Sequence, residues 1–152
     1  MGLSSYERHV QGVEERFHER FPEWAERKVR WENLYRKRGW FRTMTGFVCR
    51  GDYSRNELFN FPVQGPAFHV LLWSLIETVR RLRRRKMRSK VIAEIHDTML
   101  GDVHRDELND YLAMVRSIMT EEVRRHWSWI VTPLEIEVEM AETNWFEKRK
   151  VA

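Results

Sequence analysis

The sequence predicts a single-domain protein of the α+β class, in which amphipathic helices accompany short antiparallel β-hairpins. Three observations support this class. Apolar residues recur at helical spacing over several long segments. Two other segments hold short apolar runs on either side of a turn, a pattern typical of hairpins. Residues 134–140 alternate strictly between apolar and acidic side chains, so they predict a strand with one buried side and one solvent-facing side.

The first third of the chain predicts two helices and a hairpin. Residues 6–17 carry apolar side chains on one helical face, and Pro22 interrupts this helix. A second helix is expected over residues 23–38, because Gly39 is a typical helix stop. Residues 40–49 then predict a hairpin.

Two longer helices are expected in the rest of the chain. Ser54 and Glu57 have the spacing of a capping box, which marks a helix start, and Pro62 is expected to kink this helix or start it again. From residue 64 to about residue 85, one apolar stripe contains Phe68, Leu72, Leu75, Ile76, Val79 and Leu82. A further helix over residues 105–127 carries Leu108, Leu112, Val115 and Met119 on one face.

The composition is that of an ordinary globular protein. The 152 residues are 42% hydrophobic and 33% charged, and no apolar segment approaches the length needed to span a bilayer. The only cysteine, Cys49, excludes a disulfide framework and a cysteine metal site, which indicates a reducing cytoplasm. The seven tryptophans predict either a large aromatic core or a surface that a partner covers.

Positive charge is concentrated in residues 80–90, which contain no acidic residue. The cations of this run are Arg80, Arg81, Arg83, Arg84, Arg85, Lys86, Arg88 and Lys90. Such a run attracts nucleic-acid phosphates whatever the base sequence, and the consecutive residues 83–86 are the expected contacts. The alternative is a solvated helix end whose cations suit the negative end of the helix dipole.

The pair His96-Asp97 carries the strongest chemical prediction. It follows the apolar run of residues 91–95 and precedes a second strand-like run, so a hairpin would hold the Asp97 carboxylate at its tip. Phosphoryl-transfer enzymes need a carboxylate held in this way, because a divalent metal must be fixed where charge develops on oxygen. By contrast, Glu135, Glu137 and Glu139 are interpreted as solubilising residues of an exposed strand face.

Four segments together resemble family A DNA polymerases of the bacterial DNA polymerase I and bacteriophage type. They are Phe-His-Glu-Arg-Phe-Pro at residues 17–22, Asn-Phe-Pro-Val-Gln-Gly-Pro-Ala at residues 60–67, Ile-His-Asp at residues 95–97, and residues 133–145 from Pro-Leu to Asn-Trp. Their order and approximate spacing agree with the C-terminal part of the family, so the resemblance covers nearly the whole chain.

The resemblance implies a fold and a domain organisation. The chain would form the C-terminal part of a polymerase palm, with an antiparallel sheet and a catalytic hairpin packed on long helices. Residues 1–152 would be one domain, in which residues 1–39 are a helical segment directed toward the fingers and residues 40–152 are the palm segment.

The resemblance also implies residue roles. Asp97 would ligate the two catalytic Mg²⁺ ions, and His96 would contact the primer end. Gln64 and Asn60 would touch the minor-groove side of the primer-template, where amides can sense pairing geometry with little sequence preference. Arg55 is a further candidate DNA contact, since the family expects a basic residue where this chain has Asn56.

Two positions depart from the family pattern. Thr98 replaces the glutamate that usually follows His-Asp, and Pro66 replaces a threonine. The missing glutamate normally supports the metal site, so its loss bears on activity. Glu94 would lie on the same side of its strand as His96 and is a hypothetical substitute carboxylate.

The implied active site is incomplete. A second metal-binding aspartate, and a fingers helix with the Arg and Lys that bind the triphosphate, belong to earlier segments of the family. We therefore expect the C-terminal fragment of a split DNA polymerase, with phage as a plausible source. It would be inactive alone and would act in DNA replication with partner fragments, primer-template DNA and dNTP, and not at a membrane. The alternative is a non-catalytic DNA-binding or assembly module, an inactive palm remnant.

Overall fold

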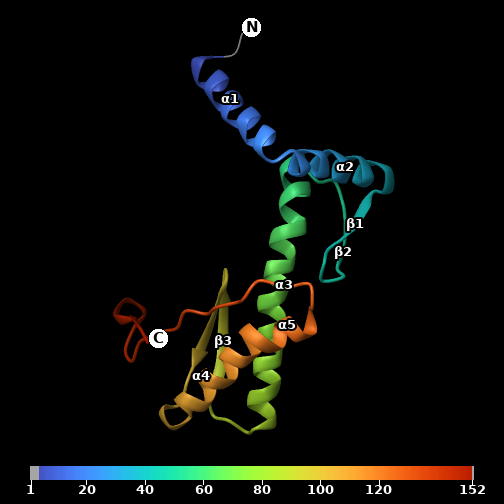
Figure 1. Ribbon diagram of the computed structural model, residues 1–152. Helices are drawn as coiled ribbons and strands as arrows, with labels where there is room; N and C mark the ends of the chain where they lie inside the picture. Colours follow the sequence, from blue (N-terminus) through green and yellow to red (C-terminus); the bar gives the residue numbers. More distant parts are fainter. Residues whose placement is uncertain (1–3, 152) are drawn as a thin grey trace. The chain divides into compact units, whose positions relative to one another are not determined.

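The structure is a computed structural model that describes residues 4–151. Backbone contacts divide the chain into two compact units, and the boundary lies between Gly65 and Pro66. The first unit holds α1 (Ser5–Arg20), α2 (Pro22–Arg38), β1 (Trp40–Arg42), β2 (Val48–Arg50) and the first part of α3 (Arg55–Arg84) (Figure 1). No helix within residues 4–151 is both long enough and apolar enough to cross a membrane.

Local sequence signals account for the N-terminal helices. Ser4 and Glu7 form a capping box at the start of α1: the Glu7 N–H donates to Ser4 Oγ at 3.2 Å, and the Ser4 N–H donates to Glu7 Oε2 at 2.7 Å. Helix α2 begins at Pro22 and ends before Gly39, whose φ of +70° is the left-handed conformation that favours glycine. Both predicted helices are present; α1 extends beyond its apolar positions at both ends, and α2 starts one residue before the predicted start and ends at the predicted Arg38.

A small aromatic core holds the first unit together. The predicted hairpin is present, with Phe41 paired to Cys49 across β1 and β2. Both residues are buried with Leu58 of α3. The ring of Trp31, from α2, packs edge-on against Phe41 at 5.4 Å between centroids. Helix α2, the hairpin and the start of α3 therefore share one core.

Helix α3 begins as predicted but is not interrupted. Ser54 and Glu57 form the expected capping box, with the Ser54 N–H donating to Glu57 Oε2 at 2.9 Å. The prediction that Pro62 restarts the helix is wrong, because α3 runs as one helix from Arg55 to Arg84. A side chain of α2, Trp31, donates the hydrogen bond that Pro62 cannot supply.

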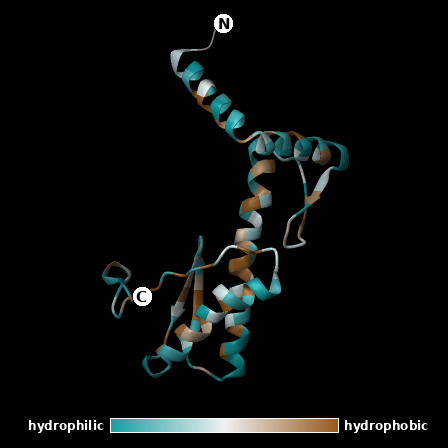
Figure 2. Ribbon diagram, viewed as in Figure 1, coloured by the Kyte–Doolittle hydropathy of each residue, from teal (hydrophilic) through white to brown (hydrophobic). Residues whose placement is uncertain are grey.

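The second half of α3 buries a face that coincides only in part with its apolar stripe, since Leu82 of the stripe is buried and Leu75 and Val79 are half-buried. Its most buried side chains include Ser74 and Thr78, whose hydroxyls donate to the carbonyls of Val70 and Ser74 at 2.8 Å. Members of the apolar stripe stay partly exposed: Phe68 at 46%, Leu72 at 39% and Ile76 at 39%. Figure 2 shows the hydrophobic colour along α3. Within residues 4–151, nothing covers this apolar face fully.

The second unit is built around a β-hairpin and an interrupted helix. Strands β3 (Lys90–Ile95) and β4 (Thr98–Asp102) pair antiparallel, with a register shift between Val91 and Ala93. The predicted helix over residues 105–127 is present in four pieces: η1 (Arg105–Glu107), α4 (Leu108–Ser117), the π-helical turn η2 (Ile118–Glu122) and α5 (Val123–His126).

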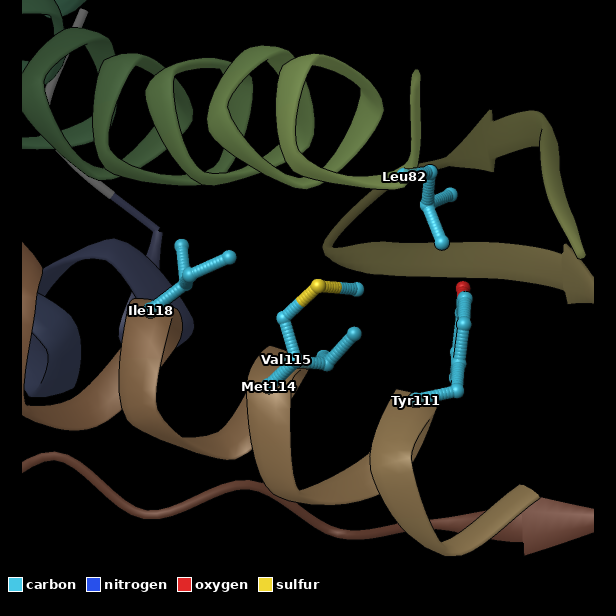
Figure 3. Close-up of a cluster of buried hydrophobic side chains, with 5 residues drawn as sticks. All are labelled: Leu82, Tyr111, Met114, Val115 and Ile118. Carbon is cyan, nitrogen blue, oxygen red and sulfur yellow. The ribbon is translucent and has the colours of Figure 1, made fainter. Parts of the chain in front are cut away.

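The core of this unit lies between α4, the end of α3 and the hairpin. Its buried members are Leu82, Tyr111, Met114, Val115 and Ile118, which converge in Figure 3 (Figure 3). Val91 and Met99, one from each strand, pack against this cluster. The hairpin is thus fixed through its apolar side chains, and its turn is left in solvent.

The C-terminal strand prediction is correct in its side-chain pattern but wrong in its extent. Leu134, Ile136 and Val138 are half-buried and the glutamates between them are exposed. Yet the assigned strand β5 is only Glu139–Met140, which pairs with β6 (Arg149–Lys150) after the short η3 (Trp145–Glu147). The pairing continues past β5 only as the hydrogen bond from the Val151 N–H to the Val138 carbonyl, at 2.9 Å. Within residues 4–151, no strand pairs with residues 134–137, so they are not assigned as strand.

Gly101 on β4 allows the close approach of α4 to the hairpin. A Cβ at this position would lie 2.4 Å from the Tyr111 hydroxyl oxygen and 3.0 Å from its Cζ. Tyr111 is 5% exposed, so its ring has little room to move away. The absence of a side chain at Gly101 is therefore a packing requirement.

We expect Gly101→Ala to lower the free energy of unfolding by roughly 1–3 kcal/mol, the usual cost of overpacking a core. Adding Tyr111→Phe removes the clashing oxygen, so the alanine should cost less in that background. Urea unfolding of the four proteins measures this coupling. Gly12→Ala is the matched control, since its Cβ would meet nothing closer than 3.6 Å and helical alanine is favoured. Equal costs of Gly101→Ala with Tyr and with Phe at position 111 would contradict the packing argument.

Candidate catalytic hairpin and nucleic-acid interface

His96 and Asp97 form the two-residue turn between β3 and β4. Ile95 pairs with Thr98, which closes the turn directly behind them. His96 has a φ of +58°, a left-handed conformation that two-residue hairpin turns require and that histidine tolerates better than most residues. Both side chains are exposed, and neither makes a hydrogen bond or ion pair with the described residues. Their donors and acceptors therefore face solvent.

A carboxylate clamp holds the base of this hairpin. Glu107 of η1 accepts three hydrogen bonds: from the Arg88 N–H at 2.9 Å, the Ser89 N–H at 2.9 Å and the Ser89 hydroxyl at 2.6 Å. Ser89, just before β3, is 3% exposed and also accepts from the His104 N–H at 3.0 Å. The residues on either side of the hairpin are thereby tied to each other and to the helix that follows.

The clamp changes the acidity of Glu107. Its hydrogen bonds from the Ser89 hydroxyl and from the Arg88 and Ser89 amides stabilise the carboxylate and lower the pKa of Glu107 to about 2. Glu107 is therefore ionised in the folded protein at any ordinary pH, and the hairpin base keeps its hydrogen bonds there.

The described residues do not by themselves fit a magnesium site. Two-metal centres need several oxygen ligands around both ions. Within residues 4–151, no group of three or more His, Cys, Asp or Glu side chains is arranged to hold a metal ion. The hairpin offers one carboxylate at its tip, from Asp97, and Glu94 is the nearest other acid along β3. A metal centre at this tip would need ligands from elsewhere.

The predicted minor-groove residues lie in the first unit and line a hollow of about 320 Å³. Asn56, Asn60 and Gln64 are spaced by four residues along α3, so their amides stand on one helical face, about 6 Å apart along the axis. Trp24 and Lys28 of α2, and Phe59 of α3, form other parts of the wall. Three amide groups are thus presented in one row beside an aromatic and cationic wall.

Trp31 explains why α3 continues through this amide row. In a regular helix the Leu58 carbonyl would accept from the N–H of residue 62, but Pro62 has no N–H. The Trp31 indole Nε1–H donates to that carbonyl at 3.1 Å instead. The hydrogen-bond vacancy left by the proline is filled from α2, so the helix does not break between Asn60 and Gln64.

The cations around the hollow differ in how far they are neutralised. Arg55, the predicted DNA contact, pairs with Glu32 at 3.3 Å and lies over the Phe59 ring at 5.6 Å. Lys28 lies over Phe59 at 5.0 Å and over Trp24 at 5.4 Å. Lys28 forms no ion pair with any residue of the described chain. Prediction from sequence missed Lys28, since an isolated lysine four residues after a tryptophan carries no recognisable signal.

The basic run separates into structural and free cations. Arg80 pairs with Glu77 at 2.6 Å, and Arg88 with Asp106 at 3.1 Å. Arg81 makes two hydrogen bonds with Glu122 of η2, at 2.6 and 2.7 Å, and this ion pair raises the pKa of Arg81. The remaining candidates are exposed and form no ion pair with the described residues: Arg83, Arg84, Arg85 and Lys86. These are the four residues of the run that the sequence predicts as DNA contacts.

The free cations lie where α3 ends. Lys86 has a φ of +54°, its N–H donates to the Arg83 carbonyl at 3.1 Å, and the Met87 N–H donates to the Leu82 carbonyl at 3.0 Å. This pattern is a Schellman cap, in which glycine is usual at the position that Lys86 occupies. The cap turns the chain toward β3 while the neighbouring arginine side chains remain in solvent.

Comparison with known proteins identifies the family. A family model described as DNA polymerase family A matches residues 2–147, nearly the whole chain. The chain belongs to DNA polymerase family A. Among curated relatives, DNA polymerase I of Lactococcus lactis subsp. cremoris is 29% identical over 103 residues, which are 68% of this chain and 11% of that protein. DNA polymerase I of Chloroflexus aurantiacus is 23% identical over 121 residues, 80% of this chain and 12% of that protein.

A solved structure supports the predicted fold. The POL domain of Pol1 from M. smegmatis, in complex with DNA primer-template and dNTP, matches with a TM-score of 0.63 at 24% identity. The match covers 78% of this chain and 22% of that chain. The predicted α+β fold of a family A polymerase segment is confirmed. The chain spans about a tenth of the length of the curated polymerases that it matches.

The Trp31 contact predicts a coupling with Pro62 in this family A segment. Trp31→Phe keeps an aromatic ring but leaves the buried Leu58 carbonyl unpaired, and should lower the free energy of unfolding by about 1 kcal/mol or more. With Pro62→Ala present, the alanine N–H serves that carbonyl, so Trp31→Phe should cost less. A double-mutant cycle by chemical unfolding measures the difference. The idea fails if Trp31→Phe costs the same in both backgrounds.

The Glu107 clamp predicts a pH-dependent contribution to stability. The pKa of Glu107 is lowered in the folded state from 4.5 to about 2. Its contribution is therefore fully present above pH 4.5 and is lost as the pH falls from 4.5 toward 2. Glu107→Gln should flatten the stability profile in that window, whereas the exposed Glu135→Gln should leave it unchanged. Urea unfolding midpoints between pH 2 and pH 7 test this, and parallel profiles for wild type and Glu107→Gln would exclude the clamp.

Proposed function

We propose that the chain is the C-terminal palm fragment of a split DNA-directed DNA polymerase, and that it supplies Asp97 to template-directed nucleotidyl transfer in DNA replication. The observation that carries this proposal is the hairpin β3–β4, which presents Asp97 at its tip in a chain of DNA polymerase family A. Asp97 would be one ligand of a two-Mg²⁺ centre, with His96 beside it toward the primer end. Ligands from a separate chain would complete the centre.

Exposed apolar surface supports a partner that covers this chain. On α3, Phe68, Leu72 and Ile76 are 39–46% exposed although they form a helical row. On β3, Ile92 and Ile95 are 58% and 44% exposed. Soluble proteins rarely leave continuous apolar rows in water, so such rows are typical of interfaces. The proposed occupant is the remainder of the polymerase domain, which would also carry the second metal-binding aspartate and the fingers helix.

Two polar surfaces support binding of primer-template DNA. The amide row of Asn60 and Gln64 can donate to minor-groove acceptors that every base pair presents. The exposed run Arg83, Arg84, Arg85 and Lys86 can bind phosphates by counterion release. In this proposal, dNTP is the second substrate, and its phosphates bind mainly to groups of the partner.

One observation favours the alternative of a non-catalytic DNA-binding or assembly module. Thr98, the first residue of β4, stands where the family usually has a glutamate, so the hairpin carries one carboxylate fewer. The alternative keeps the DNA contacts and the partner interface but gives Asp97 no role. It therefore makes the opposite prediction for a substitution at Asp97.

Primer extension tests the proposal. We expect no extension by the purified chain, and extension when the remainder of the polymerase domain is added as a second polypeptide with Mg²⁺ and dNTP. In that mixture, Asp97→Asn should reduce the extension rate roughly 100-fold or more, the usual effect of losing one group that stabilises developing charge. DNA affinity should be retained.

Asp102→Asn is the matched control, since Asp102 is an exposed aspartate at the far end of β4. It should extend primers like the wild type. If Asp97→Asn extended equally well, the non-catalytic alternative would hold. Extension by the chain alone would contradict the split arrangement.

A further inference from the structure

Lys28 is held in place but not neutralised. Its ammonium lies 5.0 Å from the centroid of Phe59 and 5.4 Å from that of Trp24, within the range in which an aromatic face attracts a cation. Within the described chain no carboxylate pairs with it. Most lysines on a helix surface sample many rotamers, whereas two aromatic faces restrict this one. The result is a positioned positive charge with its hydrogen-bond donors free for a ligand.

The position of Lys28 relates it to the amide row. Lys28 lines the same hollow as Asn56, Asn60 and Gln64 but belongs to the neighbouring helix α2. The neutral amides and the cationic ammonium therefore line one concave surface from two different helices. Arg55, the other cation near Phe59, already has Glu32 as its partner.

The minor groove of DNA offers binding partners for both kinds of group. The minor groove is about 6 Å wide and about 7.5 Å deep, and its floor presents acceptors while its rims are phosphates. When the amides reach the floor of the groove, the protein surface beside them lies within roughly one groove depth of the phosphates at the rim. A cation on that flank then meets a phosphate, and a neutral or acidic residue there would not.

We propose that Lys28 contacts a backbone phosphate of the DNA strand whose minor-groove edge faces Asn60 and Gln64. The inference rests on the proposed function, because it takes primer-template DNA as the ligand of the hollow. Trp24 and Phe59 act as positioning residues that aim the ammonium. The contact is independent of base sequence, so it adds affinity and register while the amides monitor pairing geometry.

The salt dependence of DNA binding isolates this contact. Lys28→Met keeps a flexible apolar stem over the rings and removes the charge. The slope of log affinity against log salt should become less steep by about 0.9, the value for one phosphate contact with duplex DNA. Affinity should fall roughly 5- to 10-fold at 0.1 M salt. Fluorescence anisotropy with a labelled primer-template duplex, over a series of NaCl concentrations, measures both quantities.

Two variants serve as controls. Lys28→Arg retains the charge and should keep the wild-type slope. Lys37→Met removes an exposed lysine near the end of the same helix, outside the hollow, and should also keep it. Far-UV circular dichroism and thermal unfolding of Lys28→Met establish that α2 is intact, so that a changed slope reports the contact and not a loss of structure.

The outcomes separate this inference from the proposed function. An unchanged slope for Lys28→Met, in a chain that binds duplex DNA, overturns the role of Lys28 and leaves the polymerase proposal standing. An equal change of slope for Lys37→Met also overturns it, because general charge would then be responsible. A reconstituted mixture that neither binds nor extends primer-template overturns the proposed function itself.

Discussion

Direct contact between the β3–β4 hairpin and α4 determines where the Asp97 carboxylate can be held. Tyr111 of α4 lies against Gly101, at a place where a Cβ would come within 2.4 Å of its hydroxyl. At the base of the hairpin, Glu107 accepts three hydrogen bonds from Arg88 and Ser89. The contact between Tyr111 and Gly101 fixes the distance of the strands from α4. The hydrogen bonds of Glu107 fix where the hairpin begins. The turn can therefore be exposed and still have a defined position relative to its own unit.

A comparable constraint governs the first unit. Pro62 removes a helical hydrogen bond inside the segment that carries Asn60 and Gln64, and Trp31 replaces it from α2. The amide row thus depends on a residue that is distant in sequence. In both units, a group proposed to meet DNA or metal makes few contacts of its own. Neighbouring residues with no proposed role in chemistry hold the backbone that carries it.

The charged residues divide in the same way, into those that stabilise the fold and those that remain available to a ligand. Arg81 and Arg88 belong to the basic run but serve the fold, because Glu122 and Asp106 neutralise them. Cations without an ion pair within the described chain remain available to an external phosphate: the exposed residues 83–86 in the second unit and the half-buried Lys28 in the first. A polyanion such as DNA gains affinity from cations that no carboxylate of the protein already neutralises. A count of cations along the sequence therefore overstates the surface that can bind DNA.

The sequence by itself determined features that depend on neighbouring residues: the capping boxes of α1 and α3, the end of α2 at Gly39, and the two-residue turn at His96-Asp97. It also pointed to the family, through motifs of local sequence. Tertiary structure decided the continuity of α3 through Pro62, the burial of Ser74 and Thr78 while much of the apolar stripe stays exposed, and the restriction of the C-terminal strand to Glu139–Met140. Each of these depends on a partner far along the chain, or on surface left uncovered within it. Periodicity and propensity describe a segment alone, and therefore contain no information about such partners.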